Sequence, residues 1–335
     1  MSPARLATAW ALFQGLLIEA LPFLLIGVLI SAAARWCAPG GQWLRRLPSH
    51  PVLGPLSGAA LGFALPACEC GNVPVARQLL VGGAPLGAAL GFLFAAPVLN
   101  PIVLASTWAA FPNQPWLLLA RPLGAVLVAV GLALLLRLVP EAELLQGDLL
   151  AERRLALPLS EVSLLERRGG VLGGGVLGGG VLGGGVLGGG ALAAATGTPR
   201  RPSLAELFRH GGQEFLNLAL LLVLGCLLAA LVQTFVPRTW LLTVGGAPTL
   251  SILALMLLAM VVSVCSSVDA FLALSFAAQV TPGALLAFLL LGPVIDLKLV
   301  GLLGLLLRPR GLLLTIAGAG LLVLLIGQWI NLWRL

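Results

Sequence analysis

Two cysteines flank a glutamate in the stretch PACECGNVP, which occupies residues 66–74 of an otherwise apolar region. The C-x-C spacing is neither the C-x-x-C of thioredoxin-like proteins nor that of a zinc knuckle. The prolines and the glycine predict an interrupted helix here, and on irregular backbone both thiols of a C-x-C point the same way. Thiolates suit a soft, thiophilic ion, although a buried cysteine is also common as a small apolar side chain. Both interpretations stay open for Cys68 and Cys70.

The second half of the chain repeats the pattern of this stretch. Cys265 matches Cys68 at an offset of 197 residues, and Asp269 matches Asn72 at the same offset. Further along, a PVID segment matches a PVLN segment at an offset of 196. Two polar motifs in register predict an internal duplication. If the two repeats cross, Cys265 comes close to Cys68 and Cys70, and the three sulfurs would form a metal site.

Ionisable side chains occur in the same apolar regions, away from the loops. A charge at the centre of a membrane helix costs about 2.5–3.5 kcal/mol, so such residues are expected to pair, to face a cavity or to be neutral. We predict that the carboxylates handle substrate or protons, with a purely structural pairing of the repeats as the alternative. Arg77 and Lys298 are predicted to form ion pairs or to gate the path. The predicted substrate-binding residues lie at the helix breaks and are Cys68, Glu69, Cys70, Asn72, Asn100, Cys265, Ser266, Ser267, Asp269 and Asp296.

The sequence leaves the charge of the ligand open. Helix N-termini near residues 72 and 267 would offer free N–H groups, which suit an anion or a carbonyl oxygen. Backbone carbonyls that the prolines leave without a helical donor would suit a cation instead. The uncharged amides and hydroxyls at the same breaks both donate and accept hydrogen bonds, so they do not decide between the two.

The composition places these residues in a membrane protein. Of the 335 residues, 59% are hydrophobic and only 9% are charged, and a soluble protein of this length needs far more polar residues to cover its surface. We predict an all-α, polytopic membrane protein of about 8–10 transmembrane helices, some of them broken. The net charge of +7 then reflects arginine-rich loops and not a nucleic-acid partner. The approximate apolar segments are 8–34, 52–67, 72–83, 85–110, 116–138, 213–236, 249–264, 267–280, 283–306 and 312–333.

Basic residues divide and orient the chain. We predict a first membrane repeat over residues 1–138, a linker over 139–211 and a second membrane repeat over 212–335. Five crossings per half, counting the short segments 72–83 and 267–280, place all three basic loops on one side, which the positive-inside rule identifies as cytoplasmic. The odd number makes the two repeats inverted. The linker contains VLGGG four times, a composition that predicts a flexible segment and no membrane helix.

Several enzyme signatures are missing from the sequence. It contains no nucleotide-binding P-loop and no G-x-S-x-G, H-E-x-x-H or EF-hand pattern, and both histidines, His50 and His210, lie in predicted loops. These absences argue against a primary pump and against a metalloprotease. We therefore expect no enzymatic activity and no cofactor.

The motif pairs CECGNVP with PVLNP, and CSSVDAF with GPVIDLK, resemble the family of predicted bacterial permeases that includes the organoarsenical efflux permeases. The resemblance covers both membrane halves but not the VLGGG segment. It implies a multi-pass protein of the bacterial inner (plasma) membrane. Characterised members export trivalent organoarsenicals, and by motif match their proposed cysteine ligands correspond to Cys68, Cys70 and Cys265. Many members have no known substrate, so the resemblance does not fix arsenic as the substrate.

We predict a secondary permease that moves a small solute or ion across the inner membrane in exchange for protons, for example in the efflux of a thiophilic metalloid or metal species. Two alternatives stay open. One is a thiol-redox membrane protein that uses the C-x-C thiols. The other is a scaffold or a membrane subunit of a multi-component permease, with a protein partner docked on the cytoplasmic loop. The sequence leaves the substrate, the direction of transport, the coupling ion and the oligomeric state undetermined.

Overall fold

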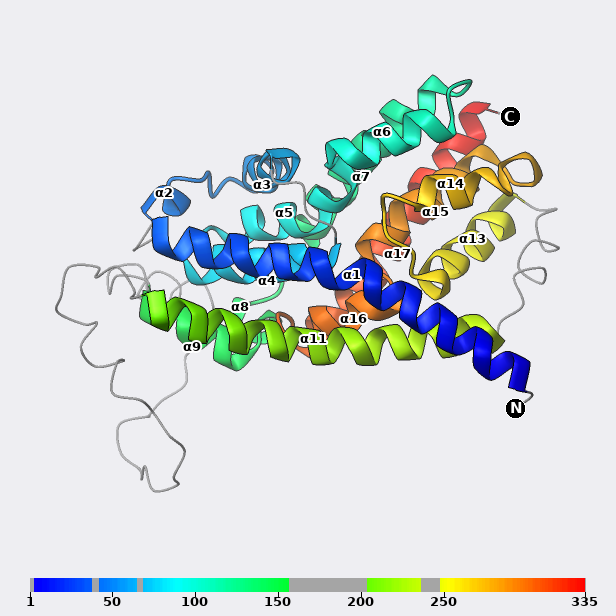
Figure 1. Cartoon of the computed structure of the whole chain (residues 1–335). Coiled ribbons are helices and arrows are strands. Elements are labelled where there is room, and N and C mark those ends of the chain that lie inside the picture. The colour runs from blue at the N-terminus through cyan, green and yellow to red at the C-terminus, as the bar shows by residue number, and fades with distance from the viewer. Residues whose placement is uncertain (1–2, 38–41, 65–68, 157–203, 236–247, 335) are drawn as a thin grey trace.

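The computed structural model describes residues 3–37, 42–64, 69–156, 204–235 and 248–334. Within these ranges every element is a helix, which confirms the predicted all-α protein (Figure 1). The helices, with one 3₁₀ helix (η2), are α1 (Pro3–Cys37), α2 (Gln42–Arg45), α3 (Leu53–Ala64), α4 (Glu69–Val81), α5 (Leu86–Leu99), α6 (Pro101–Ala110), α7 (Pro115–Leu136), α8 (Glu141–Leu144), α9 (Gly147–Ala156), α11 (Leu204–Phe235), α13 (Pro248–Val262), α14 (Asp269–Leu274), η2 (Ala277–Gln279), α15 (Pro282–Val294), α16 (Leu297–Leu303) and α17 (Pro309–Arg334).

Six stretches of the described chain are long and apolar enough to cross a membrane, which confirms a polytopic membrane protein. In two of them, consecutive helices share one crossing, because α5 continues into α6 and α15 into α16. Six is fewer than the expected 8–10. The reason is that α3, α4, α13 and α14 have only 12, 13, 15 and 6 residues, whereas a crossing needs about 20. The six spans are Leu6–Ala33, Leu86–Ala110, Pro115–Leu136, Gly211–Thr234, Pro282–Leu303 and Pro309–Trp333.

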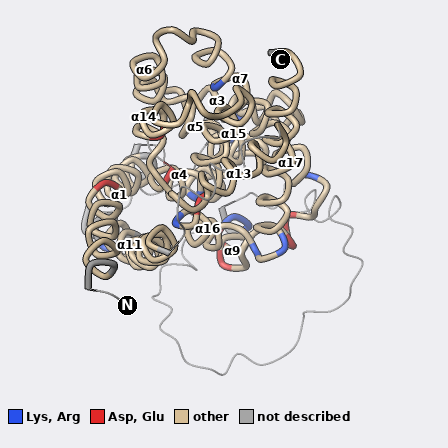
Figure 2. The backbone as a smooth tube through the Cα atoms, turned by 90° about the vertical axis from the view of Figure 1, so that its right-hand side faces the viewer, with Lys and Arg blue, Asp and Glu red and all other residues tan. Residues whose placement is uncertain are grey.

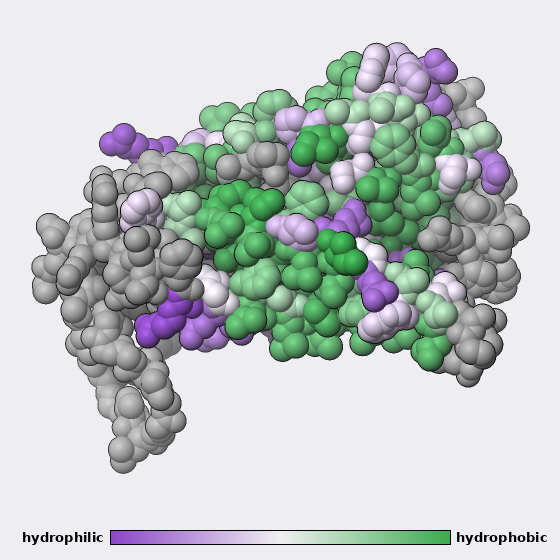
Figure 3. All heavy atoms as spheres, in the orientation of Figure 1, coloured by the Kyte–Doolittle hydropathy of each residue, from purple (hydrophilic) through white to green (hydrophobic). Residues whose placement is uncertain are grey.

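The outside of the bundle is apolar, as a lipid-facing surface requires. Figure 3 shows a face on which hydrophobic residues predominate over α1 and α11, with a few hydrophilic residues between them. Large apolar side chains stand exposed on these two helices, among them Ile18 and Leu216. In a soluble protein such a surface would associate or aggregate, so it is consistent with a bilayer around these helices.

Helices α8 and α9 lie at one side of the bundle, which we call the loop side (Figure 1). The Leu144 carbonyl accepts a hydrogen bond of 2.9 Å from the N–H of Arg308, so α17 starts at this side, and α7 ends there just before α8. The first turn of α1 and the last turn of α17 lie at the opposite side. Helices α8 and α9 lie within the predicted linker 139–211. Residues 157–203, which contain the VLGGG repeats, lie outside the described residues.

The first short pair, α3 and α4, enters from the loop side and returns to it. A methyl group added to Gly58 would lie 1.9 Å from the carbonyl oxygen of Ala88, and one added to Gly62 would lie 2.5 Å from Cβ of Ala96. Such backbone-to-backbone contact is what small residues permit in membrane helices. Gly58 lies beside Ala88 and the later Gly62 beside the later Ala96, so α3 and α5 run in the same direction. Because α4 ends just before α5 begins, α3 and α4 form a re-entrant pair and not two crossings.

The second short pair, α13 and α14, enters from the side opposite to the loop side. The start of α13 packs on the end of α17, where a methyl group on Gly327 would lie 3.2 Å from Cδ1 of Ile252. The start of α15 is at the same end, since the N–H of Gly283 donates a 2.7 Å hydrogen bond to Oδ1 of Asn331. This inverted arrangement is what the predicted inverted repeats require, although the duplication itself stays a prediction.

Both composite spans are broken three residues after a proline. Asn100 lies between α5 and α6, and its Oδ1 accepts a hydrogen bond of 3.0 Å from the N–H of Ile102. Asp296 lies between α15 and α16, and its Oδ1 accepts one of 2.6 Å from the N–H of Leu299. Each side chain thus caps the helix that follows it and satisfies an N–H group that the break leaves without a helical acceptor.

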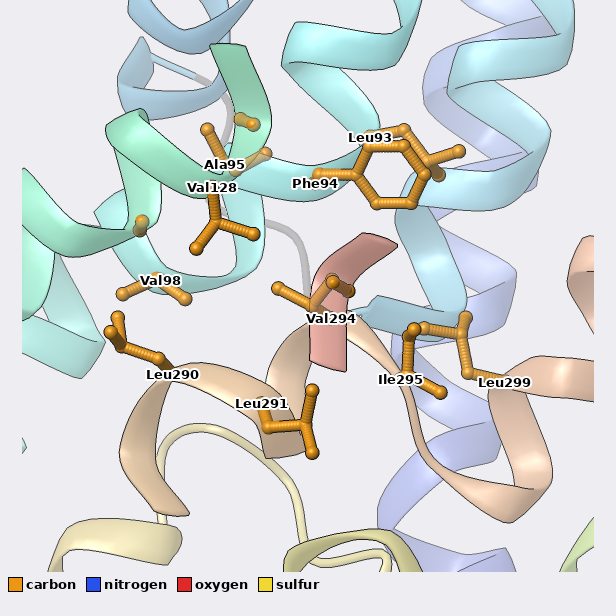
Figure 4. Packing of buried hydrophobic residues seen from close by; sticks show 14 of the residues in the cluster. Leu93, Phe94, Ala95, Val98, Val128, Leu290, Leu291, Val294, Ile295 and Leu299 are labelled. Atoms are coloured by element: carbon orange, nitrogen blue, oxygen red, sulfur yellow. The ribbon is translucent and has the colours of Figure 1, made fainter. Parts of the chain in front are cut away.

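The core lies where α5 and α15 pack against each other in the middle of the molecule. Figure 4 shows side chains from both helices gathered in one cluster, together with Val128 of α7. Val98 and Val294 are almost completely buried. Each lies two residues before a helix break. The core therefore packs directly against the two breaks. The labelled members of this cluster are Leu93, Phe94, Ala95, Val98, Val128, Leu290, Leu291, Val294, Ile295 and Leu299.

Replacing Gly58 by leucine is expected to destabilise the protein by about 1–3 kcal/mol or more, because the added side chain must push α3 away from α5. The matched control is Gly15→Leu on α1, where no atom lies within 4 Å of an added methyl group. The measurement is the thermal unfolding midpoint in detergent, followed by size-exclusion chromatography. Equal midpoints for the two variants would contradict the close packing of α3 on α5.

Candidate functional site

Lys298 forms the centre of the candidate site. Its ammonium Nζ lies 3.1 Å from Oε1 of Glu69 and 3.5 Å from Oδ2 of Asp296. It also donates a hydrogen bond of 2.8 Å to the carbonyl oxygen of Ser263. All four residues are buried, and Lys298 is only 2% exposed. A buried ammonium without partners would be very costly, so these three oxygen atoms are what allows Lys298 to lie here.

Breaks in three segments bring these groups together. Glu69 is the first residue of α4, Asp296 caps α16, and Ser263 follows the end of α13. In the described part of the chain Ser263 is the one non-glycine residue with a positive φ, of 45°. Its Oγ accepts a hydrogen bond of 3.2 Å from the N–H of Leu297. Backbone of this kind is strained and persists where the surroundings hold it, and here the start of α16 holds the turn after α13.

Two thiols lie in the same region as the ammonium. Cys70 and Cys265 are buried, and neither is in a disulfide. Cys70 follows Glu69 directly in the chain, and Cys265 is two residues after Ser263, so each lies next to a partner of Lys298. The Ser267 hydroxyl donates to Sγ of Cys265 at 3.4 Å, and the Cys265 thiol is hydrogen-bonded to the carboxylate of Glu19 on α1. The site therefore brings thiol and carboxylate side chains into one region, and groups of these two types are donors for soft or borderline cations.

A second buried ion pair lies next to the first. Arg121 of α7, which is fully buried, donates hydrogen bonds of 2.5 Å to Oδ2 of Asp269, 2.6 Å to the Thr107 hydroxyl and 3.3 Å to the carbonyl of Ser266. The Ser266 hydroxyl in turn donates a hydrogen bond of 3.3 Å to Oε2 of Glu69. Ser266 therefore connects the two ion pairs into one network.

The contact between Ser266 and Glu69 joins residues that the alignment of the two halves places opposite each other, at the offset of 197. Two equivalent residues can touch only close to the axis that relates their repeats. If the duplication is real, its pseudo-twofold axis passes through this contact, beside Lys298. Transporters built from inverted repeats bind their substrates at such a position.

Buried polar atoms without partners mark the same region. Neither Nδ2 nor Oδ1 of Asn72 has a hydrogen-bond partner among the described residues, although the residue is completely buried. Oδ1 of Asp269 is also without one. Most buried polar groups in proteins are satisfied, so these atoms are available to a ligand or to water.

Most of the predicted site residues lie in this network, but not all. Asn100 caps α6, and Arg77 lies two turns from Glu69 on α4, where it pairs with Glu152 at 2.8 Å. Cys68 lies outside the described residues, and among the described ones no three histidine, cysteine or acidic side chains are placed to hold a metal ion. The three-sulfur metal site therefore stays a prediction. The predicted residues that the structure brings together are Glu69, Cys70, Cys265, Ser266, Ser267, Asp269, Asp296 and Lys298.

Helix α4 starts earlier than the sequence analysis expected. Helix α4 starts at Glu69 and runs through Gly71 and Pro74, so Cys70 and Asn72 are helical and not on irregular backbone. The expected helix start near residue 72 was therefore wrong by three residues. Pro74 is tolerated close to the start of α4, although it cannot donate to the carbonyl of Cys70.

Five residues near the network were not among the predicted site residues. Glu19 and Arg121 are charges within apolar segments, a signal that was available, but their partners are far away in the sequence. Cys226 lies in a plain apolar segment, where a cysteine is typical of packing, yet a methyl group on the adjacent Gly225 would lie 2.8 Å from Cα of Lys298. Ser263 is a hydroxyl at the same predicted break as Cys265, whereas Thr107 carries no distinguishing signal in the sequence.

Replacing Arg121 by methionine, or Asp269 by leucine, leaves an unpaired buried charge and should destabilise the protein by about 3–5 kcal/mol. The double variant Arg121→Met/Asp269→Leu removes both charges and should recover most of this loss. The measurement is folded yield and unfolding midpoint in detergent, with Glu143→Gln as the control, since its pair with Arg310 is exposed. A double variant as unstable as both single ones would show that the pair is not what matters.

Comparison with known proteins supports the same class. The model of a family described as predicted permeases matches residues 5–332. The chain is 34% identical to the UPF0718 protein YcgR of Bacillus subtilis (strain 168), over 86% of this chain and 85% of that protein. It is 29% identical to a Streptococcus mutans protein named "Putative two-component membrane permease complex subunit", over 88% of this chain and 86% of that protein.

No solved structure matches the chain. The membrane fold described above, with its six spans and its buried polar network, is what a permease requires. The family match extends over nearly the whole chain, and the similarity to YcgR covers most of both proteins. This chain therefore belongs to the predicted permease family.

Proposed function

We propose that this chain is a secondary permease that exports a small thiophilic cation or metalloid species through the Lys298 site, in exchange for protons. The family match supports a permease. The observation that carries the rest is the buried Lys298, which lies against two carboxylates, with two buried cysteines next to its partners in the chain. In this proposal residues 139–211 are cytoplasmic, and efflux follows the resemblance to organoarsenical permeases.

The charges of the site favour a positively charged or protonated ligand. Glu69 and Asp296 contribute two carboxylates, and Lys298 contributes one ammonium. The neighbouring pair of Arg121 and Asp269 is balanced. An anion would meet an excess of negative charge in a medium of low dielectric constant, where repulsion is strong. Cations or protons would relieve that excess, so the charges support a cation where the helix termini and free carbonyls left the choice open.

The two thiols give the site its chemical preference. Cys70 comes from α4 and Cys265 from the segment between α13 and α14, so one sulfur belongs to each predicted repeat. Sulfur ligands select soft ions and metalloids over Mg²⁺ or Ca²⁺, which prefer oxygen. A ligand bound between the two sulfurs would contact both predicted repeats at once.

Lys298 acts in this proposal as a built-in competitor for the carboxylates. When a cation or a proton occupies Glu69 and Asp296, the ammonium loses its two negative partners. It keeps its hydrogen bond to Ser263, whose strained turn joins α13 to the start of α16. Occupation of the site therefore changes the forces on that turn, and a ligand shifts a conformational equilibrium only through such differential contacts.

A second candidate is a membrane subunit of a two-component permease. The Streptococcus mutans relative is named as such a subunit. In that case the site described here would need a second protein before it transports. The thiol-redox alternative has no comparable support among the relatives, which are named for permeases or carry no activity in their names.

Replacing Lys298 by methionine, or both Cys70 and Cys265 by serine, should lower transport of a trivalent organoarsenical by at least about tenfold, because the ligands or their charge balance are lost. The measurement is flux in proteoliposomes that contain the purified chain alone, with trapped metalloid quantified by mass spectrometry. Cys37→Ser, at the end of α1, is the matched control and should transport as the unmodified protein does.

Each outcome bears on a different part of the proposal. Full activity in the Cys70→Ser/Cys265→Ser variant would refute the thiol ligands while leaving the permease intact. No flux of organoarsenical, Zn²⁺ or Cd²⁺ with the chain alone, but flux after co-reconstitution with a membrane partner, would favour the two-component alternative.

A further inference from the structure

A cavity of about 570 Å³ lies on the loop side of the candidate site, between α4, α9, α11 and α16. Its walls are mixed, with Val73 and Leu218 beside Arg77 and Asn217. None of the residues that surround it belongs to the Lys298 network. Asn217 is a polar, exposed residue in the strongly apolar span of α11, so its amide belongs in water and not in lipid.

The three wall helices that line the cavity also carry the site. From Glu69 to Arg77 on α4, and from Cys226 to Leu218 on α11, there are eight residues, or about 12 Å along a helix. From Lys298 to Gly304, at the end of α16, the distance along the chain is about 9 Å. The cavity therefore lies one to two turns beyond the site, between the same helices.

A single turn of apolar side chains separates the cavity from the Lys298 site. Leu222 lies between Leu218 and Cys226 on α11, at helical spacing, and is completely buried. Val73 lies four residues after Glu69, is 1% exposed and itself lines the cavity. The barrier is thus one layer of side chains, which rotamer changes can open without unfolding a helix.

The floor of the cavity is the segment that contains α8 and α9, and it is attached to both halves of the chain. Arg153 of α9 donates hydrogen bonds of 2.9 and 2.8 Å to the carbonyls of Leu80 and Ala84, at the end of α4. Gln146 donates hydrogen bonds of 2.8 and 3.1 Å to the carbonyls of Gly304 and Leu307, at the end of α16. Arginine and amide donors suit these helix ends, whose last carbonyls have no helical partner.

One ion pair ties the floor to the wall. Arg77 of α4 lies 2.8 Å from Glu152 of α9, and their side chains are 26% and 46% exposed. Exposed pairs of this kind contribute little to stability, typically 0–1 kcal/mol, so this one can open at little cost. The Arg121–Asp269 pair is fully buried by comparison.

We propose that this cavity is the loop-side vestibule of the permeation path and that the Arg77–Glu152 pair is its latch. The inference rests on the proposed function and adds the route by which a ligand reaches Lys298. Asp148 and Glu152 outnumber Arg77 among the charged wall residues, so the vestibule suits the same positively charged or neutral ligands as the site.

The test uses Asn217→Cys, with Arg310→Cys as the matched control, because Arg310 is on the loop side but does not line the cavity. Each purified variant is labelled in detergent with a positively charged methanethiosulfonate. Both positions should label. The adduct at position 217 should then slow the alkylation of Cys70 and Cys265 by N-ethylmaleimide about tenfold, as read by peptide mass spectrometry, whereas the adduct at 310 should not.

After reconstitution, the adduct at position 217 should also abolish the flux of trivalent organoarsenical, while the adduct at 310 leaves it unchanged. Glu152→Gln should speed the labelling of Asn217→Cys severalfold, because it removes the latch.

Failure of Asn217→Cys to label, or an adduct there that changes neither alkylation nor flux, would overturn the vestibule. An unchanged labelling rate with Glu152→Gln would overturn the latch alone. The alkylation result does not depend on the transported species, so it decides the vestibule even if organoarsenical flux is absent and the proposed function fails.

Discussion

The burial of one ammonium group constrains the whole centre of this protein. Lys298 lies far from bulk water, so oxygen atoms must surround it, and no single regular helix can supply them. Glu69, Asp296 and the Ser263 carbonyl do so from three different segments, each at the end or start of a helix. The breaks in the helices and the charge they enclose are therefore one feature, because each would be costly without the other.

Both broken spans leave backbone N–H groups without a helical acceptor, and a different side chain caps each of them. Asn100 and Asp296 cap the helices that follow them in the same way. The amide cap is neutral and needs no counterion, whereas the carboxylate cap brings a charge that Lys298 and Glu69 then balance. The polar network therefore gathers at the second break, and the two halves contribute unequally to it. In the function proposed above, that inequality means that a ligand is held mainly by α4, α16 and the segment after α13.

The sequence predicted what depends on local pattern. Apolar runs gave the helices to within a few residues, and prolines followed by Asn100 and Asp296 marked both broken spans. Among the described residues α3 and α14 are too short to cross a membrane. A run of apolar residues does not say whether the chain crosses or turns back. The partners of Arg121, Glu19 and Arg77 were not predictable, because a pair separated by tens of residues or more leaves no pattern in one sequence.

The pair of Arg121 and Asp269 has a consequence for how the chain is made. The two residues are 148 positions apart, so at about 5–20 residues per second α7 is synthesised roughly 7–30 s before its partner exists. Over that interval a membrane helix carries an arginine with no carboxylate to meet it. Arg121 lies near the start of α7, from where a long side chain can reach the headgroups. We therefore expect the Arg121 side chain to be directed toward the headgroups until the second half of the chain is inserted.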